Sequence, residues 1–186
     1  HCVDMNKFET DRTIEFIPPD GSFELMTYRL NTQLKPLIMV EVHIEHHSST
    51  KIEYNIKAKS NYRSKSIAHN VEILIPVPND LQKPVFKTMV GNVNYLPDQD
   101  CIMWIINDLR GQTEIHLKLQ FNVPTIRGND VDKHLKKPIA VKFDIPSFTV
   151  SGIQVRYLKI QEKSGYQAFP YVKYVTRNGE FQIRMI

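Results

Sequence analysis

The chain has 186 residues, of which 41% are hydrophobic and 24% charged, a balance that supports one folded domain with a buried core and excludes an intrinsically disordered protein. The net charge of +4 is mildly basic and by itself selects neither a nucleic acid nor a membrane as partner. Because no apolar run is long enough to cross a bilayer, no secretory leader opens the chain and no Asn-x-Ser/Thr sequon occurs, we expect a soluble, cytoplasmic fragment without disulfides.

Apolar residues alternate with polar or charged ones along most of the chain. This period-two pattern is typical of strands with one buried and one exposed face. It predicts strands at residues 38–44, 52–58, 71–77, 102–106, 115–123, 139–145 and 153–157, and closing strands at 171–175 and 181–186. Because several short strands follow one another at hairpin spacing, we predict an all-β fold, an antiparallel β-sandwich.

Turn-forming residues separate the predicted strands. A Pro-Pro-Asp-Gly turn precedes the first strand, and a turn at Arg177-Asn178-Gly179 divides the closing segment. Further turns are expected at 76–80, 97–98, 127–130 and 151–152. Only residues 21–30 and 131–136 could hold a helical turn, and both stretches are too short to form a layer. We therefore expect one domain over residues 1–186.

The sequence carries no catalytic signature. It contains no Gly-rich phosphate loop, Gly-x-Ser-x-Gly elbow, His-Glu-x-x-His helix or Cys-x-x-Cys pair. We therefore predict no catalytic residues, no cofactor and a protein that is not an enzyme.

Three histidines near Glu45 form the one cluster that could hold a metal ion. In a strand, His43 and Glu45 would point to the same outer face, whereas His46 and His47 run into a turn at residues 48–50. Since no clear fourth ligand is evident elsewhere, we expect an exposed hairpin end and no metal site. An unrelated β-sandwich with an enzymatic site at this cluster stays as an alternative.

A basic run with one aromatic residue comes nearest to a nucleic-acid-binding pattern. It comprises Lys57, Lys59, Tyr62, Arg63 and Lys65. Its alternation with apolar residues is typical of the solvent face of a strand that runs into a loop. We therefore predict no nucleic acid, with acidic lipid headgroups as the next candidate partner.

Several local strings are far more specific than the composition. They are FIPPDGSFELM at 16–26, NVEILIPVP at 70–78, SGIQVRYLK at 151–159 with EKSGY at 162–166, and YVKYVTRNG at 171–179. In this order, and over nearly the whole chain, they resemble the mu homology domain of clathrin adaptor medium (mu) chains. Residues 31–32, 57–60 and 164–168 are most similar to the type-one adaptor of the trans-Golgi network and endosomes.

The resemblance implies an architecture and a set of partners. Residues 1–186 would be the C-terminal part of a mu homology (cargo-binding) domain with its N-terminal strands missing. The partners would be the two large chains and the small chain of a heterotetrameric adaptor and, indirectly, clathrin, on trans-Golgi network and endosome membranes and clathrin-coated vesicles. Residues 88–95 lack the lysines that plasma-membrane medium chains carry in the corresponding loop, so we expect any acidic-lipid contact to be weak.

The resemblance also implies a cargo site for Tyr-x-x-Φ sorting peptides, where Φ is a bulky apolar residue. A docked peptide would lie extended along a strand edge. Val155, Leu158 and Val172 would line the Φ pocket, and Tyr171 and Lys173 would contribute to the tyrosine pocket. Because residues 171–173 are adjacent in a predicted strand, the pockets would lie on either side of the peptide or use the backbone.

Two departures from the family pattern leave a second reading open. The family places Trp-Val-Arg where this chain has Tyr171-Val172-Lys173, and a lysine lacks the planar guanidinium group. In addition, a Phe-x-Asp pair and a lysine that complete the family's tyrosine pocket would lie upstream of His1. The alternative is a coat medium chain that no longer reads tyrosine motifs and serves as a scaffold or an acidic-lipid-binding surface.

Overall fold

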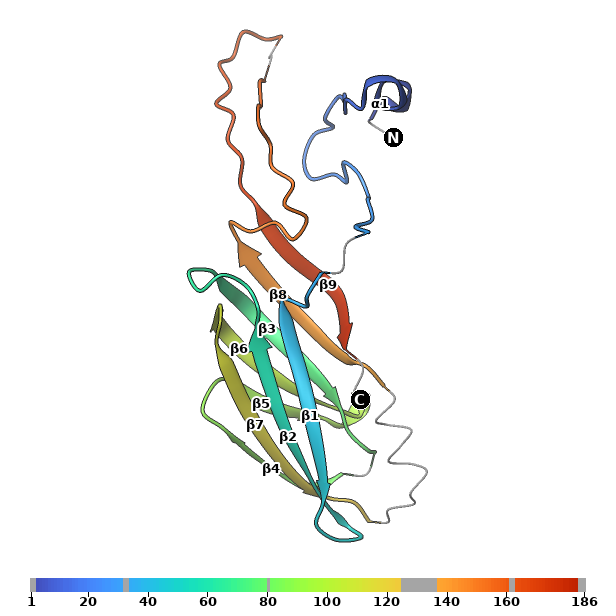
Figure 1. The fold of residues 1–186 in the computed structure, drawn as a ribbon, viewed down its shortest axis with the longest axis vertical. Helices are drawn as coiled ribbons and strands as arrows, with labels where there is room; N and C mark the ends of the chain where they lie inside the picture. Colours follow the sequence, from blue (N-terminus) through green and yellow to red (C-terminus); the bar gives the residue numbers. More distant parts are fainter. Residues whose placement is uncertain (1–2, 32–33, 80, 125–136, 161–162, 184–186) are drawn as a thin grey trace. The chain divides into compact units, whose positions relative to one another are not determined.

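A computed structural model describes residues 3–31, 34–79, 81–124, 137–160 and 163–183 (Figure 1). The chain divides into two compact units, residues 1–34 and residues 35–186. The larger unit contains the sheets, and the smaller one contains a single short helix among its described residues.

The smaller unit opens with α1 (Met5–Asp11), which the sequence analysis did not predict. The helix begins where the Asp4 carboxylate accepts hydrogen bonds from the backbone N–H groups of Asn6 and Lys7. It ends at Arg12, which adopts a left-handed conformation with φ 62°. The helical turn considered for residues 21–30 is absent, and the one considered for residues 131–136 lies outside the described residues.

The described residues of the larger unit form two antiparallel sheets. The first has the strand order β1-β2-β7-β4, and the second has the order β5-β6-β3-β8-β9. The strands are β1 (Ile38–His46), β2 (Lys51–Ser60), β3 (Ile67–Pro76), β4 (Gln82–Thr88), β5 (Asn92–Leu96), β6 (Cys101–Arg110), β7 (Glu114–Asn122), β8 (Ile139–Pro146) and β9 (Val175–Ile183). The prediction of an all-β, antiparallel sandwich is confirmed.

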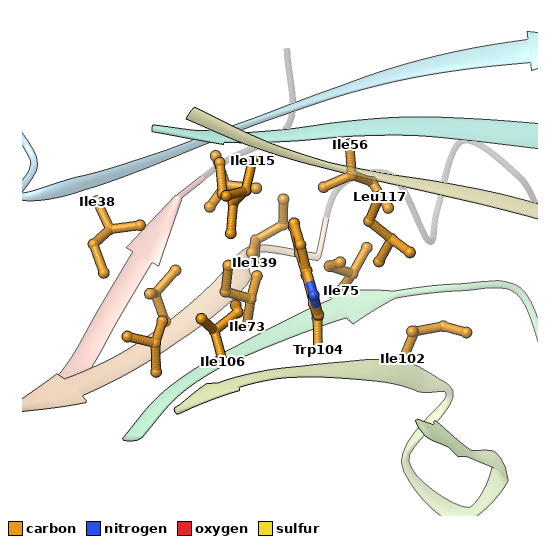
Figure 2. Packing of buried hydrophobic residues seen from close by; sticks show 14 of the residues in the cluster. Ile38, Ile56, Ile73, Ile75, Ile102, Trp104, Ile106, Ile115, Leu117 and Ile139 are labelled. Carbon is orange, nitrogen blue, oxygen red and sulfur yellow. The ribbon is translucent and has the colours of Figure 1, made fainter. Parts of the chain in front are cut away.

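The core lies between the two sheets, as Figure 2 shows. Ile56 and Leu117 from the first sheet face Ile73, Trp104 and Ile139 from the second, and all five side chains are buried. At ~25 cal/mol per Å² of apolar surface removed from water, this contact is the main stabilising term of the larger unit. It follows directly from the alternation in the sequence, because the apolar member of each pair faces inward.

The connection between β4 and β5 is fixed to this core. The indole Nε1–H of the buried Trp104 donates a hydrogen bond of 2.8 Å to the backbone carbonyl of Val90. The next residue, Gly91, has φ 79°, and a Cβ atom placed there would lie 2.2 Å from the carbonyl oxygen of Ile105. Only glycine fits this close approach of two backbones.

The sequence analysis missed β4 and β5, and residues 88–95, expected as a loop, contain most of β5. Pro84 interrupts the pattern in β4, and a proline cannot donate a ladder hydrogen bond. The strand tolerates it because β4 lies at the edge of its sheet and its register with β7 shifts between Gln82 and Val85.

Two predictions for the C-terminal part were wrong. Residues 153–157 and 171–174 are not in strands, because no neighbouring strand pairs with them among the described residues. The expected turn at residues 177–179 lies inside β9. The register of β9 against β8 shifts there, so that β9 contains extra residues relative to β8. The Asn178 side-chain amide donates a hydrogen bond of 2.5 Å to the carbonyl of Val141.

Two buried tyrosines provide a test of the core. The Tyr54 ring packs edge-on against Phe121, with ring centroids 5.2 Å apart, and its hydroxyl has no hydrogen-bond partner among the described residues. The Tyr62 hydroxyl, by contrast, donates to the carbonyl of Leu109 at 2.6 Å. Burial raises the pKa of both phenols, to about 12 for Tyr62.

We expect Tyr54→Phe to raise the free energy of unfolding by about 1 kcal/mol, because it removes a buried, unsatisfied hydroxyl. Tyr62→Phe should lower it by about 1 kcal/mol, because it leaves the Leu109 carbonyl without its donor. Urea denaturation of both variants measures the difference. An equal loss of stability in the two variants would contradict the assignment of the Tyr54 hydroxyl as unpaired.

Candidate functional site

The five residues expected to bind peptide lie on two extended segments, residues 152–160 and 163–174, between β8 and β9. In Figure 1 this excursion, coloured orange to red, extends beyond the ends of the strands of the larger unit. The backbone of neither segment belongs to a sheet.

The side chains of these residues are open to solvent. Val155, Leu158 and Val172 are 47%, 44% and 42% exposed, and Tyr171 is 84% exposed. Lys173 is exposed as well. Side chains that line a closed pocket are less exposed than this. The described residues alone therefore do not form the Φ pocket or the tyrosine pocket.

A hydrogen bond joins the two segments. The backbone N–H of Val155 donates a hydrogen bond of 2.7 Å to the Tyr174 hydroxyl. The backbone carbonyl of Tyr174 in turn accepts a 2.8 Å bond from the N–H of Ser147, next to the end of β8. Val155 is thus brought beside the residue that follows Lys173.

Tyr174 is a positioning residue that the sequence analysis did not identify. The sequence does give one indication of this role. Residues two apart in an extended chain share a face, and Tyr174 is two residues from Val172. Its role depends, however, on a contact across 19 residues of sequence, which no local pattern reveals.

The base of the excursion is held by polar contacts. The Thr176 hydroxyl donates to the carbonyl of Phe148 at 2.7 Å, and the Arg177 guanidinium pairs with Asp144 at 3.0 Å. These contacts continue the β8–β9 pairing to the point where the two segments leave the sheet. The segments therefore start from a defined position.

Large apolar side chains recur along the excursion and remain exposed. They are Ile153, Val155, Tyr157, Leu158, Ile160, Tyr166, Phe169, Tyr171 and Val172. A concentration of exposed apolar residues of this kind is typical of a surface that another protein segment covers. The smaller unit, taken by itself, has a similar set: Phe16, Ile17, Phe23, Met26, Tyr28, Leu30 and Leu34.

The first sheet carries an open groove of about 560 Å³ that includes three lysines in its lining. Two of these are already paired: Lys57 lies 2.5 Å from Glu41, and Lys118 lies 2.5 Å from Glu53. Since ion pairing compensates much of the positive charge, the groove gives limited support to an acidic-lipid surface.

The basic run of the sequence analysis does not present its aromatic residue. Tyr62 is buried and bonded to Leu109, so it cannot stack on a base. This placement supports the prediction that the run is a solvated strand face.

Among the residues that the structure describes, three side chains of metal-ligating type lie together at the β1–β2 end of the first sheet. Ligand atoms of Glu45, His47 and Glu53 lie within 4.8 Å of one another. His43 lies on the same strand face as Glu45, with its Nε2 atom 3.6 Å from the Glu45 carboxylate, as the alternation predicted. Hydrogen bonds from Lys118 and then Gln120 lower the pKa of Glu53 to about 2.

Comparison with known proteins identifies the family of this chain. The sequence matches the adaptor complexes medium subunit family over residues 1–185. The chain belongs to this family. The resemblance to adaptor medium chains is therefore confirmed, and so is the greater similarity to type-one adaptors.

Its relatives include medium subunits from distant organisms. The chain is 53% identical over 184 residues to the AP-1 complex subunit mu-1-I of Caenorhabditis elegans and 54% identical over 184 residues to the AP-1 complex subunit mu of Dictyostelium discoideum. These alignments cover 99% and 98% of this chain but 43% and 42% of the relatives. The chain therefore spans less than half the length of the relatives it matches.

A structural comparison agrees on the fold. A homology model of the full-length AP-3 complex in an intermediate open conformation has a TM-score of 0.59 at 18% identity, with 99% of this chain and 53% of that chain covered. At this identity the likeness concerns the fold alone. Within the described ranges, no helix has the length and apolar character that a membrane span requires.

We expect Tyr174→Phe to remove the acceptor of the Val155 N–H and to speed hydrogen exchange at that amide by roughly ten-fold, the effect of losing one hydrogen bond. Tyr157→Phe is the matched control, because Tyr157 is an exposed tyrosine on the same segment. Exchange measured by NMR gives the rate of this single amide. Equal exchange in both variants would show that Tyr174 does not position the segment.

Proposed function

We propose that this chain is the C-terminal part of the cargo-recognition domain of an AP-1-type clathrin adaptor medium chain, which binds Tyr-x-x-Φ sorting signals in membrane-protein tails. The observation that carries the proposal is 53% identity over 99% of the chain to an AP-1 mu subunit. The function would be vesicle-mediated intracellular protein transport.

The proposed partners rest on the family resemblance and on relatives that are named as subunits of AP-1 complexes. The chain would assemble with two large subunits and one small subunit and, through them, with clathrin. It would act on the cytoplasmic side of trans-Golgi network and endosome membranes and on clathrin-coated vesicles.

In this proposal, the two segments between β8 and β9 gain strand partners from a part of the protein outside the described residues. Residues 153–157 keep the alternation of a strand, and their apolar side chains are exposed. Additional strands would satisfy their backbone groups and bury one of their faces. The addition of these strands would also complete the peptide site.

The proposed binding mode uses main chain for affinity and side chains for selectivity. A cargo tail would add as an extended strand, with its backbone paired to an edge. Val155, Leu158 and Val172 would enclose the Φ side chain, whose burial stabilises the complex by roughly 1.5–3 kcal/mol. Tyr171 would pack on the tyrosine ring, and the Lys173 ammonium group would lie near the phenol hydroxyl.

We expect Leu158→Ser, in a protein that includes the upstream strands, to weaken binding of a Tyr-x-x-Φ peptide by about ten-fold or more, because it removes apolar contact with Φ. Tyr157→Ala should leave the affinity within about two-fold, since the proposed pocket does not use this neighbour. Isothermal titration with the peptide and its Tyr→Ala counterpart gives the constants. The cargo-reading role fails if wild-type protein binds both peptides equally.

We expect Lys173→Arg to tighten binding of the same peptide by about two- to five-fold, because a guanidinium group stacks on an aromatic ring better than an ammonium group does. The Tyr→Ala peptide should not share this gain, which separates a contact with the phenol ring from general charge attraction. An equal gain for both peptides would place Lys173 outside the tyrosine pocket.

The alternative of an acidic-lipid-binding scaffold is tested on the same protein. Co-sedimentation with phosphatidylserine vesicles that exceeds co-sedimentation with neutral vesicles, together with absent peptide binding, would favour it over cargo recognition.

A further inference from the structure

The first sheet places three possible metal ligands together on its solvent-facing side, away from the two segments expected to bind peptide. Glu45 lies near the end of β1, His47 directly follows that strand, and Glu53 lies on β2. In the β1–β2 register, Glu45 and Glu53 are direct cross-strand partners. The strand pairing therefore holds the two carboxylates opposite each other, with the imidazole beside them.

The distances between the donor atoms suit a small cation. His47 Nε2 and Glu53 Oε2 share a hydrogen bond of 3.1 Å, and one possible ligand atom from each of the three residues lies within 4.8 Å of the others. Bonds of about 2.0–2.2 Å from a tetrahedral Zn²⁺ ion place its ligand atoms roughly 3.3–3.6 Å apart. Glu45 and His47 are exposed, so their side chains have room to rotate toward that spacing.

The cluster brings two carboxylates to directly paired positions. Like charges at directly paired positions of a sheet repel each other. Between the two carboxylates lies the neutral Asn55 amide, whose Nδ2 atom is 3.4 Å from Glu45 Oε1 and 3.2 Å from Glu53 Oε1. Lys118, 2.5 Å from Glu53, supplies one positive charge. A second imidazole also faces the cluster, because His43 Nε2 lies 3.6 Å from Glu45 Oε1.

Glu53 is held in place before any ion binds. Although it lies on the outer side of the sheet, it is only 3% exposed, because neighbouring polar side chains cover it. Lys118 pairs with Oε1, and the Gln120 amide donates to Oε2, which faces His47. Outer residues that orient a ligand in this way are typical of metal sites.

We propose that Glu45, His47 and Glu53 bind one Zn²⁺ ion, with water completing its coordination. An imidazole together with two carboxylates favours zinc over calcium and magnesium, which bind through oxygen ligands alone. From the sequence we expected no metal here, because no clear fourth ligand was evident. The strand pairing that brings Glu53 to His47 does not follow from the spacing.

The test is titration of ZnCl2 into the full chain, followed by calorimetry and by thermal unfolding. We expect one ion per chain and a raised Tm, because an ion that binds only the folded state stabilises it. His47→Ala and Glu45→Gln should each weaken zinc binding by about ten-fold or more. Glu45 is the informative position, because its side chain is exposed and its replacement leaves the Glu53 network intact.

The matched control is His69→Ala. His69 also pairs with a carboxylate, Asp108, at 2.6 Å, but it lies on β3 in the other sheet, so its loss should leave zinc binding unchanged. X-ray absorption of the zinc-loaded chain should show nitrogen and oxygen ligands. The proposal is overturned if the chain binds no zinc, if neither variant weakens binding, or if the spectrum shows a sulfur ligand.

Discussion

Each strand that the structure describes, from β1 to β9, is paired through its backbone hydrogen-bonding groups with a neighbouring strand. β3 lies between β6 and β8, and its apolar residues enter the core from a backbone that is paired on both sides. Residues 153–157 have the same alternation but no partner among the described residues, and they remain outside any sheet. One constraint thus explains both the paired sandwich and the open candidate site.

The strands could be predicted from the sequence wherever a segment with apolar alternation also has a neighbouring strand to pair with. The patterns at residues 52–58 and 115–123 correctly predict β2 and β7, because these strands pair with each other and bury their apolar faces in the same core. Pattern alone failed for β4, where Pro84 breaks the alternation but an edge position and a bulge accommodate it. It also failed for α1, which depends on the capping side chain of Asp4 and not on an apolar stripe.

The candidate sites depend more strongly on contacts between distant residues. Resemblance to the family selects Val155, Leu158 and Val172, but it does not reveal that Tyr174 holds the backbone at Val155. Likewise, Glu53 looks like an ordinary solvent-facing strand residue in the sequence. Its burial arises from the register of β2 with β7, which sets Gln120 opposite it and Lys118 close by. A period-two pattern fixes the face of a residue but not its neighbours across the sheet.

The bond between Trp104 and Val90 has a spectroscopic consequence. The chain has one tryptophan, and its indole ring is fully buried between the two sheets, where its N–H is engaged by a backbone carbonyl. Tryptophan fluorescence therefore reports on the sandwich interior and not on residues 152–160 and 163–174, which carry tyrosines but no indole. An event in these segments would therefore leave the tryptophan emission unchanged, without any added label.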